Sequence, residues 1–370
     1  MKYKEIVNNI LNNSMHGKIK GKTFRITAGT DAKELVRELN NAITDAGGFG
    51  IVNWTLAGED SEYFINNACT QQFELTAKHM QKTLPAFDGF ITIWSDNDLF
   101  AGQDLNPEKL KQYKALVMPV RDKLIIDSKP WVFMYYPSTS NAVNAQMSLK
   151  QYTEFWRQVS SLDYMKMKKS MMPLKELMEK TDSVRIVQTG TTDLSFSIKK
   201  QKAVICAGEC NIPDGEVYIA PIKNSVNGFI QFNTDIEYAG IPYKNIRLEF
   251  KDGRVVRGTS EVNNDKFQKL LDSDKGARYT GEFALGVNPL ITNCLKDLLF
   301  DEKINGSLHI ALGKCYKDSP NGNNSQIHFD IVQIQTPEYG GGEIYFDNKL
   351  IRKDGKFIPK NLHALNKTGK

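Results

Sequence analysis

The second half of the chain carries oxygen and imidazole side chains inside apolar segments that are typical of strands. His309 lies in GSLHIALG, and His328 and Asp330 lie in QIHFDIVQI. Glu216 and Glu282 each follow a glycine and precede an apolar run, in DGEVYIAP and GEFALG. Glutamate, aspartate and histidine bind divalent metals well where thiolates are absent. These residue types therefore indicate a site for one or two divalent cations.

His328 and Asp330 form the sharpest local pattern, because they stand two residues apart in an apolar run. In a strand, side chains at this spacing point to the same face, where both can bind one metal ion. Phe329 and Ile331 then point to the opposite face. The competing interpretation is a polar pair on an edge strand, and the apolar flanks argue against its full exposure.

The other candidates each have an ordinary structural interpretation when taken alone. His309 would be a hydrogen-bonded histidine of the core, and Tyr316 a packing residue. Glu216 and Glu282 would be exposed at strand ends, although a buried glutamate requires a partner such as a metal. As a set they indicate hydrolysis: two ions sharing a carboxylate could acidify a bridging water, with a glutamate moving the proton and Tyr316 stabilising an oxyanion.

Other motifs carry less information. Cys206 and Cys210 form C-x-x-x-C, but no further cysteine or histidine stands near them to complete a zinc site. The sequence contains neither G-x-S-x-G nor H-E-x-x-H. The three glycines at 340–342 lack the lysine and the following helix of a phosphate-binding loop, so a tight turn is predicted there.

Strands and helices alternate in the first half of the sequence. Apolar runs predict strands, and apolar residues at helical spacing predict the helices between them. The predicted strands are 22–29, 50–56, 87–95 and 131–137; the predicted helices are 31–47, 61–85, a third that begins at Pro107, and 148–180 with a break at Pro173. This alternation predicts an N-terminal α/β domain, residues 1–180, with a mainly parallel sheet.

Short alternating runs replace this pattern after residue 180. A hairpin is predicted at Asp252-Gly253, and one helix, 264–273, interrupts the runs. The fold class predicted for the whole chain is therefore α/β with two domains. The second, residues 181–370, is predicted to be an α+β domain with a mainly antiparallel sheet that carries the metal site.

The composition is that of an ordinary globular protein, with 370 residues, 41% of them hydrophobic and 25% charged. The net charge of +5 is small for this length, so no nucleic-acid partner is predicted. Apolar runs stay below the ~18 to 20 residues of a transmembrane helix, and the N-terminus lacks a signal-like apolar core. Five cysteines, an odd number, agree with reduced thiols. We therefore expect a cytoplasmic location and no membrane partner.

Several segments of the sequence, in the same order, resemble the thermophilic metalloprotease family of aminopeptidases, of the aminopeptidase T and aminopeptidase S type. The segments cover most of residues 182–335, whereas the N-terminal half resembles the family in pattern only. They are GTTDLSFS, CNIPDGEVYIAP, LEFKDGRVV, GARYTGEFALGVNP, LFDEKINGSLHIALGKCY and IHFDIV. The loop 317–327 is short for this family.

The resemblance implies a role for each candidate residue. Metal binding is assigned to five of them: Glu216, Glu282, His309, His328 and Asp330. Catalytic roles are assigned to Glu282 and Tyr316, with Glu282 expected to bridge two ions and either glutamate able to act as the base. The resemblance also implies two divalent metal ions (Zn, Co, Mn or Mg), peptide substrates with a free N-terminus, and a homodimer.

The leading hypothesis is thus a cytoplasmic metallo-aminopeptidase. It would remove N-terminal residues from peptides through a two-metal centre that activates a bridging water. A different metal-dependent amide hydrolase on the same scaffold and a non-catalytic binding protein are the alternatives.

Overall fold

The computed structural model describes residues 2–55, 59–95, 104–238 and 240–368. The chain divides into two compact units. The first comprises Met1–Tyr164 and Gly208–Pro213, and the second comprises Met165–Ala207 and Asp214–Lys370. The first holds a parallel sheet and the second holds antiparallel sheets, so the predicted fold class is confirmed. The assignment of catalysis to residues 181–370 stays a prediction.

The first unit is built on a four-stranded parallel sheet with strand order β2-β1-β3-β4. The strands are β1 Thr23–Gly29, β2 Phe49–Thr55, β3 Gly89–Trp94 and β4 Trp131–Tyr135. Helix α2, Lys33–Asp45, contacts β1 and β2. Its buried residues Leu35, Val36, Leu39 and Ile43 recur at helical spacing, as the sequence predicts.

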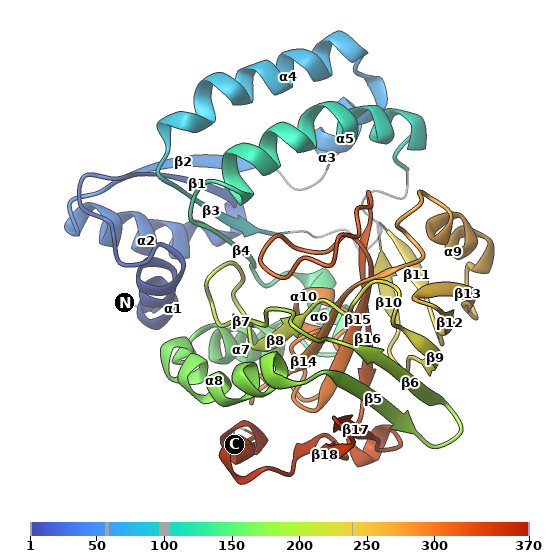
Figure 1. Cartoon of the computed structure of the whole chain (residues 1–370). Helices are drawn as coiled ribbons and strands as arrows, with labels where there is room; N and C mark the ends of the chain where they lie inside the picture. The colour runs from blue at the N-terminus through green and yellow to red at the C-terminus, as the bar shows by residue number, and fades with distance from the viewer. Residues whose placement is uncertain (1, 56–58, 96–103, 239, 369–370) are drawn as a thin grey trace. The chain divides into compact units, whose positions relative to one another are not determined.

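The remaining helices of this unit are α1 Lys4–Asn9, α3 Glu59–Asn67, α4 Thr70–Thr83, α5 Pro107–Arg121, α6 Thr139–Asn144 and α7 Leu149–Ser160. Helices α4 and α5 lie side by side and share a small core of their own (Figure 1). The single helix predicted at 61–85 is two helices, α3 and α4. The Gln72 side chain accepts a hydrogen bond from the Cys69 amide at 2.8 Å, which caps the start of α4.

The break predicted at Pro173 is wrong. Pro173 lies inside α8, Tyr164–Lys180, and the helical segment is interrupted earlier, between α7 and α8. A proline inside a helix removes one backbone hydrogen bond. The helix continues past it because Met171, Leu174 and Met178 are fully buried in the core of the second unit, and their burial outweighs that loss.

The second unit contains two antiparallel sheets. The eight-stranded sheet comprises, in spatial order, β13 Arg254–Thr259, β12 Arg247–Lys251, β9 Asn227–Gln231, β6 Thr192–Ser197, β5 Ser183–Gln188, β17 Glu343–Phe346, β18 Lys349–Lys353 and β19 Lys356–Phe357. The five-stranded sheet comprises β16 His328–Ile334, β15 Ser307–Gly313, β14 Thr280–Gly286, β8 Glu216–Ile219 and β7 Val204–Cys206. A short pair, β10 Ile236–Tyr238 and β11 Ile241–Tyr243, and helices α9 Asn264–Leu271 and α10 Leu298–Asp301 complete the unit.

The main core of the second unit lies against one face of the five-stranded sheet. Phe283 of β14 and Phe329 of β16 are fully buried in it. The Phe283 ring meets Phe196 of β6 edge to face, with ring centroids 5.0 Å apart, so the two sheets share this core. In the part of the chain that the structure describes, no helix has the length and apolar character needed to cross a membrane.

Candidate metal centre

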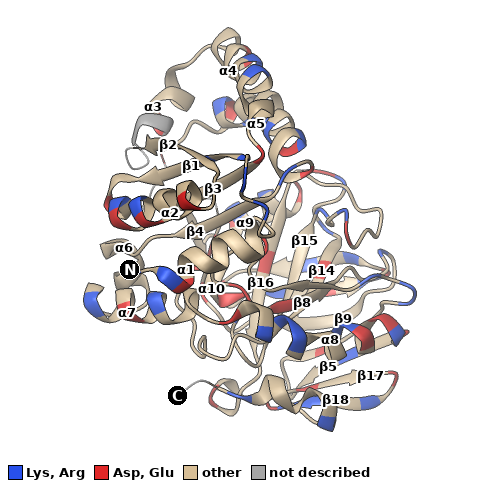
Figure 2. Cartoon of the chain, turned by 90° about the vertical axis from the view of Figure 1, so that its left-hand side faces the viewer, with Lys and Arg blue, Asp and Glu red and all other residues tan. Residues whose placement is uncertain are grey.

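The five predicted ligands lie on four neighbouring strands of the five-stranded sheet. Glu216 begins β8, Glu282 lies on β14, His309 on β15, and His328 and Asp330 on β16. In Figure 2, β8 and β16 accordingly carry acidic, red segments among mainly tan neighbours. Residues far apart in the sequence are thus brought together by strand pairing alone.

Strand register places these side chains on one face of the sheet. Asp330 pairs with Ala311, and His309 pairs with Ala284. Residues directly opposite each other share a face, so small alanines stand between the polar side chains and leave them room. The opposite face carries core residues such as Phe283. His328 and Asp330 do share a face, with Phe329 and Ile331 on the other, as the two-residue spacing predicts.

The five side chains form one tight group. His309 Nε2 lies 3.2 Å from Glu282 Oε1, 3.4 Å from Glu216 Oε2 and 3.8 Å from Asp330 Oδ1. His328 Nε2 lies 3.3 Å from Asp330 Oδ1 and 3.5 Å from Glu282 Oε2. All except His328 are buried, and the His328 side chain is 19% exposed. The structure therefore brings all five predicted residues together, and their role as ligands stays a prediction.

Buried carboxylate oxygens in this group have no hydrogen-bond partner among the described residues. They are Glu216 Oε2, Glu282 Oε2 and Asp330 Oδ1. A buried acceptor left without a partner costs about 1–3 kcal/mol, and more when it is charged. Among the described residues, three sets of side chains each offer ligand atoms within 4.8 Å of one another: Glu282, His328 and Asp330; Glu216, Glu302 and His309; and Cys206, Asp214 and Glu216. This set of donors fits divalent metal ions.

The carboxylates also change the pKa of both imidazoles. Burial by itself lowers the pKa of His309, but the nearby carboxylates, Glu216 first, raise it to about 9. Burial likewise opposes the charge on His328, whose pKa Asp330 and Glu282 hold well above its usual value. In return the imidazoles keep the pKa of Asp330 below its usual range in spite of burial. The group as a whole therefore favours positive charge at its centre.

The orientation of His328 is fixed by a backbone contact. Its Nδ1 donates a hydrogen bond to the Lys314 carbonyl oxygen at 2.7 Å, which directs Nε2 toward the carboxylates. Gly281 sits at a bulge in β14, immediately before Glu282. A Cβ atom at Gly281 would collide with that same Lys314 oxygen, so glycine permits the close approach.

Tyr316 lies in the loop between β15 and β16, beside this group. Its ring centroid is 4.6 Å from that of His328 and 5.6 Å from that of Tyr218, and the residue is 45% exposed. Asn323 anchors the same loop by donating to the carbonyl oxygens of Gly276 at 2.9 Å and Gly313 at 2.6 Å. Tyr316 thus stands where the group opens to solvent, and its catalytic role stays a prediction.

Sequence reasoning missed three charged residues that lie beside Glu216: Asp214, Glu302 and Lys303. The Lys303 ammonium is fully buried; it pairs with Glu216 Oε1 at 2.8 Å, with Asp214 Oδ1 at 3.8 Å and with Glu302. Burial, reinforced by the charges of Glu216 and Asp330, raises the pKa of Glu302 to about 8. All three stand inside segments that carry the family resemblance. A Glu-Lys pair before a glycine, however, is typical of a solvated turn, so nothing local indicates its burial.

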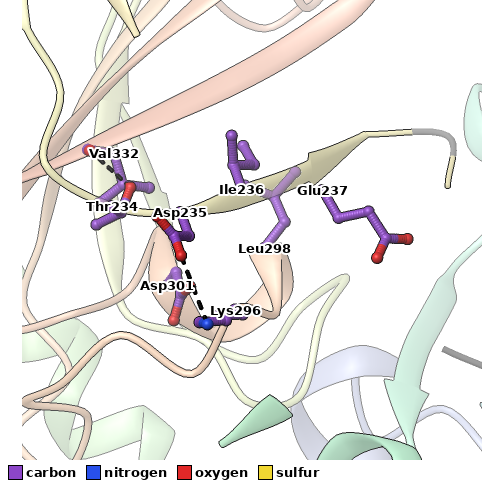
Figure 3. Close-up of a pocket in the computed structure, with 8 residues that line it drawn as sticks. All are labelled: Thr234, Asp235, Ile236, Glu237, Lys296, Leu298, Asp301 and Val332. Carbon is purple, nitrogen blue, oxygen red and sulfur yellow. Dashed lines mark hydrogen bonds and ion pairs between the residues drawn. The ribbon is translucent and has the colours of Figure 1, made fainter. Parts of the chain in front are cut away.

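A second acidic group supports α10 and lies outside this cluster (Figure 3). Asp235 pairs with Lys244 at 3.0 Å and Lys296 at 3.5 Å. Asp301 accepts hydrogen bonds from the Leu295 amide at 2.6 Å and the Cys294 thiol at 3.1 Å. Because these carboxylates already have partners, we assign them to anchoring the helix that leads into Glu302 and Lys303.

The chain is similar to known proteins in both sequence and structure. The profile of the thermophilic metalloprotease family (M29) matches residues 5–357. The chain is 34% identical over 167 residues to aminopeptidase 2 of Geobacillus stearothermophilus, and 31% identical over 165 residues to aminopeptidase T of Thermus aquaticus. Each alignment covers 40% of this chain and 38% of the relative, so the chain aligns with about two fifths of the length of these curated relatives.

Two solved structures share the fold across nearly the whole chain. Wild-type AmpT from Thermus thermophilus matches with a TM-score of 0.79 and 17% identity, over 97% of this chain and 99% of that chain. A 2,5-dihydroxypyridine dioxygenase from Pseudomonas putida KT2440 matches with a TM-score of 0.60 and 12% identity, over 96% and 98%. At these identities the likeness establishes the fold alone.

Proposed function

Because this chain belongs to the thermophilic metalloprotease family (M29), we propose that it is a metal-dependent aminopeptidase that removes N-terminal residues from peptides. The observation that carries the proposal is the buried group of Glu216, Glu282, His309, His328 and Asp330, in which one oxygen of each carboxylate lacks a hydrogen-bond partner among the described residues. The aminopeptidase names of the aligned relatives support the reaction class.

The charge of the group supports a centre of two divalent ions. Among the described residues around it, five carboxylates are buried or nearly so: Asp214, Glu216, Glu282, Glu302 and Asp330. Glu302, whose pKa is raised to about 8, is counted as protonated. If both histidines are neutral ligands, Lys303 then offsets one of the other four negative charges and three remain. One divalent cation leaves part of that charge uncompensated, and buried charges require compensation, so the charge favours two cations. Zinc, cobalt, manganese and magnesium all accept oxygen and imidazole ligands.

The side chains then divide the work of hydrolysis. Bound divalent ions would supply Lewis-acid polarisation of the scissile carbonyl and would lower the pKa of water. Glu282 reaches both histidines, which suits a carboxylate shared between two ions and able to move a proton. Tyr316, beside His328 at the exposed edge, could donate its hydroxyl to the developing oxyanion.

We further propose that the substrates are peptides with a free N-terminus, that the protein is cytoplasmic and that it forms a homodimer. The fold by itself does not identify the reaction, because a dioxygenase shares it. Family membership and the carboxylate-rich donor set favour hydrolysis. A different metal-dependent amide hydrolase or a non-catalytic binding protein would be revealed by the substrate panel described next.

The test begins with metal analysis of the purified chain. Peptides with free and acetylated N-termini are then assayed with and without a chelator, followed by addition of zinc, cobalt, manganese or magnesium. We expect about two metal ions per chain, cleavage of free-amine peptides only, and loss of cleavage on chelation. Cleavage of acetylated peptides alone, or protein with neither metal nor activity, would overturn the proposal.

A pair of variants makes the test specific to the site. Glu282→Gln removes one carboxylate charge, and we expect cleavage to fall by about 10²- to 10⁴-fold. Glu338→Gln is the matched control, because Glu338 is exposed and belongs to the same unit. Equal activity of both variants would remove Glu282 from the mechanism.

A further inference from the structure

The Lys303 ammonium is held in place by the backbone as well as by its ion pairs. Lys303 follows α10, and its carbonyl oxygen accepts a hydrogen bond from the backbone N–H of Asn288 at 3.0 Å. The Asn288 side chain donates in turn to the Asp214 carbonyl oxygen at 2.6 Å. Asn288 is fully buried and so ties the two segments that carry Lys303 and Glu216 to each other. The ammonium is therefore a fixed part of the site.

This ammonium divides the two oxygens of Glu216 between different partners. Oε1 lies 2.8 Å from Lys303 Nζ, within hydrogen-bond distance. Oε2 faces His309 Nε2 at 3.4 Å and has no hydrogen-bond partner among the described residues. A carboxylate can bind a metal through one oxygen or through both. Oε1 therefore accepts from the ammonium, and Oε2 is the oxygen that faces the other candidate ligands.

Building on the proposed function, we propose that Lys303 is a positioning residue that keeps Glu216 a one-oxygen metal ligand. The ammonium fulfils this role by contacting Glu216 and not the metal or the substrate. It leaves a coordination position available that a second Glu216 oxygen would otherwise fill, and hydrolysis needs such a position for water or the substrate carbonyl.

The test compares cobalt-loaded full-length variants. Lys303→Met removes the donor and its charge while keeping the length of the side chain, and Lys303→Arg restores both. Lys353→Met is the matched control, because Lys353 also pairs with an acidic residue in the same unit, Glu343, at 3.0 Å, and is exposed. Cobalt content, the visible absorption of the bound cobalt and the kinetic constants are measured for each protein.

We expect Lys303→Met to bind cobalt with weaker visible absorption, because coordination by a second Glu216 oxygen raises the coordination number. Its kcat should fall about 10- to 100-fold with little change in KM. Lys303→Arg should recover most of both signals, and Lys353→Met should match the wild type. A fully loaded Lys303→Met protein with the wild-type spectrum and kcat would overturn the proposal.

A crystal structure of the zinc-loaded wild type tests the same point without any substitution, should Lys303→Met fail to fold. We expect only Oε2 of Glu216 within about 2.2 Å of a zinc ion, with Oε1 remaining on Lys303. Both oxygens bound to zinc would overturn the proposal. Failure of the proposed function is distinguishable, since it would appear in the wild type as absence of bound metal or of peptide cleavage.

Discussion

Replacing Asn323 by alanine tests how the loop between β15 and β16 holds Tyr316 beside the metal group. Asn323 is 3% exposed, and its side-chain amide donates to the carbonyl oxygens of Gly276 and Gly313 at 2.9 Å and 2.6 Å. These contacts join the loop to the segment before β14 and to the end of β15. Asn323→Ala removes both donors and adds no bulk.

The expected loss of stability follows from those two contacts. One buried hydrogen bond contributes about 0.5–1.5 kcal/mol net, and an acceptor left unsatisfied costs about 1–3 kcal/mol. Loss of both bonds should therefore lower the free energy of unfolding by about 2–4 kcal/mol. With an m value of about 2–3 kcal/mol/M, the urea midpoint should fall by about 1 M. The kcat for a free-amine peptide should also fall, because Tyr316 and the Lys314 carbonyl belong to the same loop.

Asn324→Ala is the matched control, since Asn324 is the neighbouring residue of the same type and is exposed. Its free energy of unfolding should stay within about 0.5 kcal/mol of the wild type. Urea unfolding followed by circular dichroism, together with peptide kinetics, measures both effects. If Asn323→Ala unfolds at the same urea concentration as the control and keeps its kcat, the anchoring argument fails.

Two further predictions concern catalysis and pH. Tyr316→Phe should lower kcat by about 10²-fold or more with bound metal unchanged, as kinetics and metal analysis would show; an unchanged kcat would exclude the hydroxyl from the mechanism. Burial and the charge of Asp301 raise the pKa of Asp297 from 3.8 to about 7. The native state therefore binds this proton more tightly than the unfolded chain, so Asp297 makes the free energy of unfolding fall as pH rises through that window. Asp297→Asn, which keeps a cap for α10, should lose less stability than the wild type between pH 5 and pH 8 in urea titrations, and an equal loss would contradict the assignment.

Local patterns in the sequence were enough to predict how His328 and Asp330 are arranged. The alternation of polar and apolar residues in β16 fixes which side chains share a face, and the structure has that arrangement. The same reasoning predicted the parallel sheet of the first unit, because apolar strands alternate there with amphipathic helices. Both predictions depend on short-range periodicity, which the chain expresses within a few residues.

Contacts between distant segments could not be predicted in this way. The burial of Lys303 depends on Glu216, 87 residues earlier in the chain, and no local pattern records that pairing. Pro173 failed as a helix break for a related reason, since tertiary burial of its neighbours outweighs a local preference. Both cases depend on packing partners that only the folded structure supplies.

In the five-stranded sheet, one strand register positions both the core residues on one face and the candidate ligands on the other. Phe283 and Phe329 occupy the core face, while Glu282 and Asp330 occupy the other, each one residue away along its strand. A slip of one residue in register would move carboxylates into the core and aromatic rings into the site. The cost of burying those charges without partners opposes every such slip. The apolar core therefore fixes the strand register, and through it the positions of the candidate ligands on the opposite face.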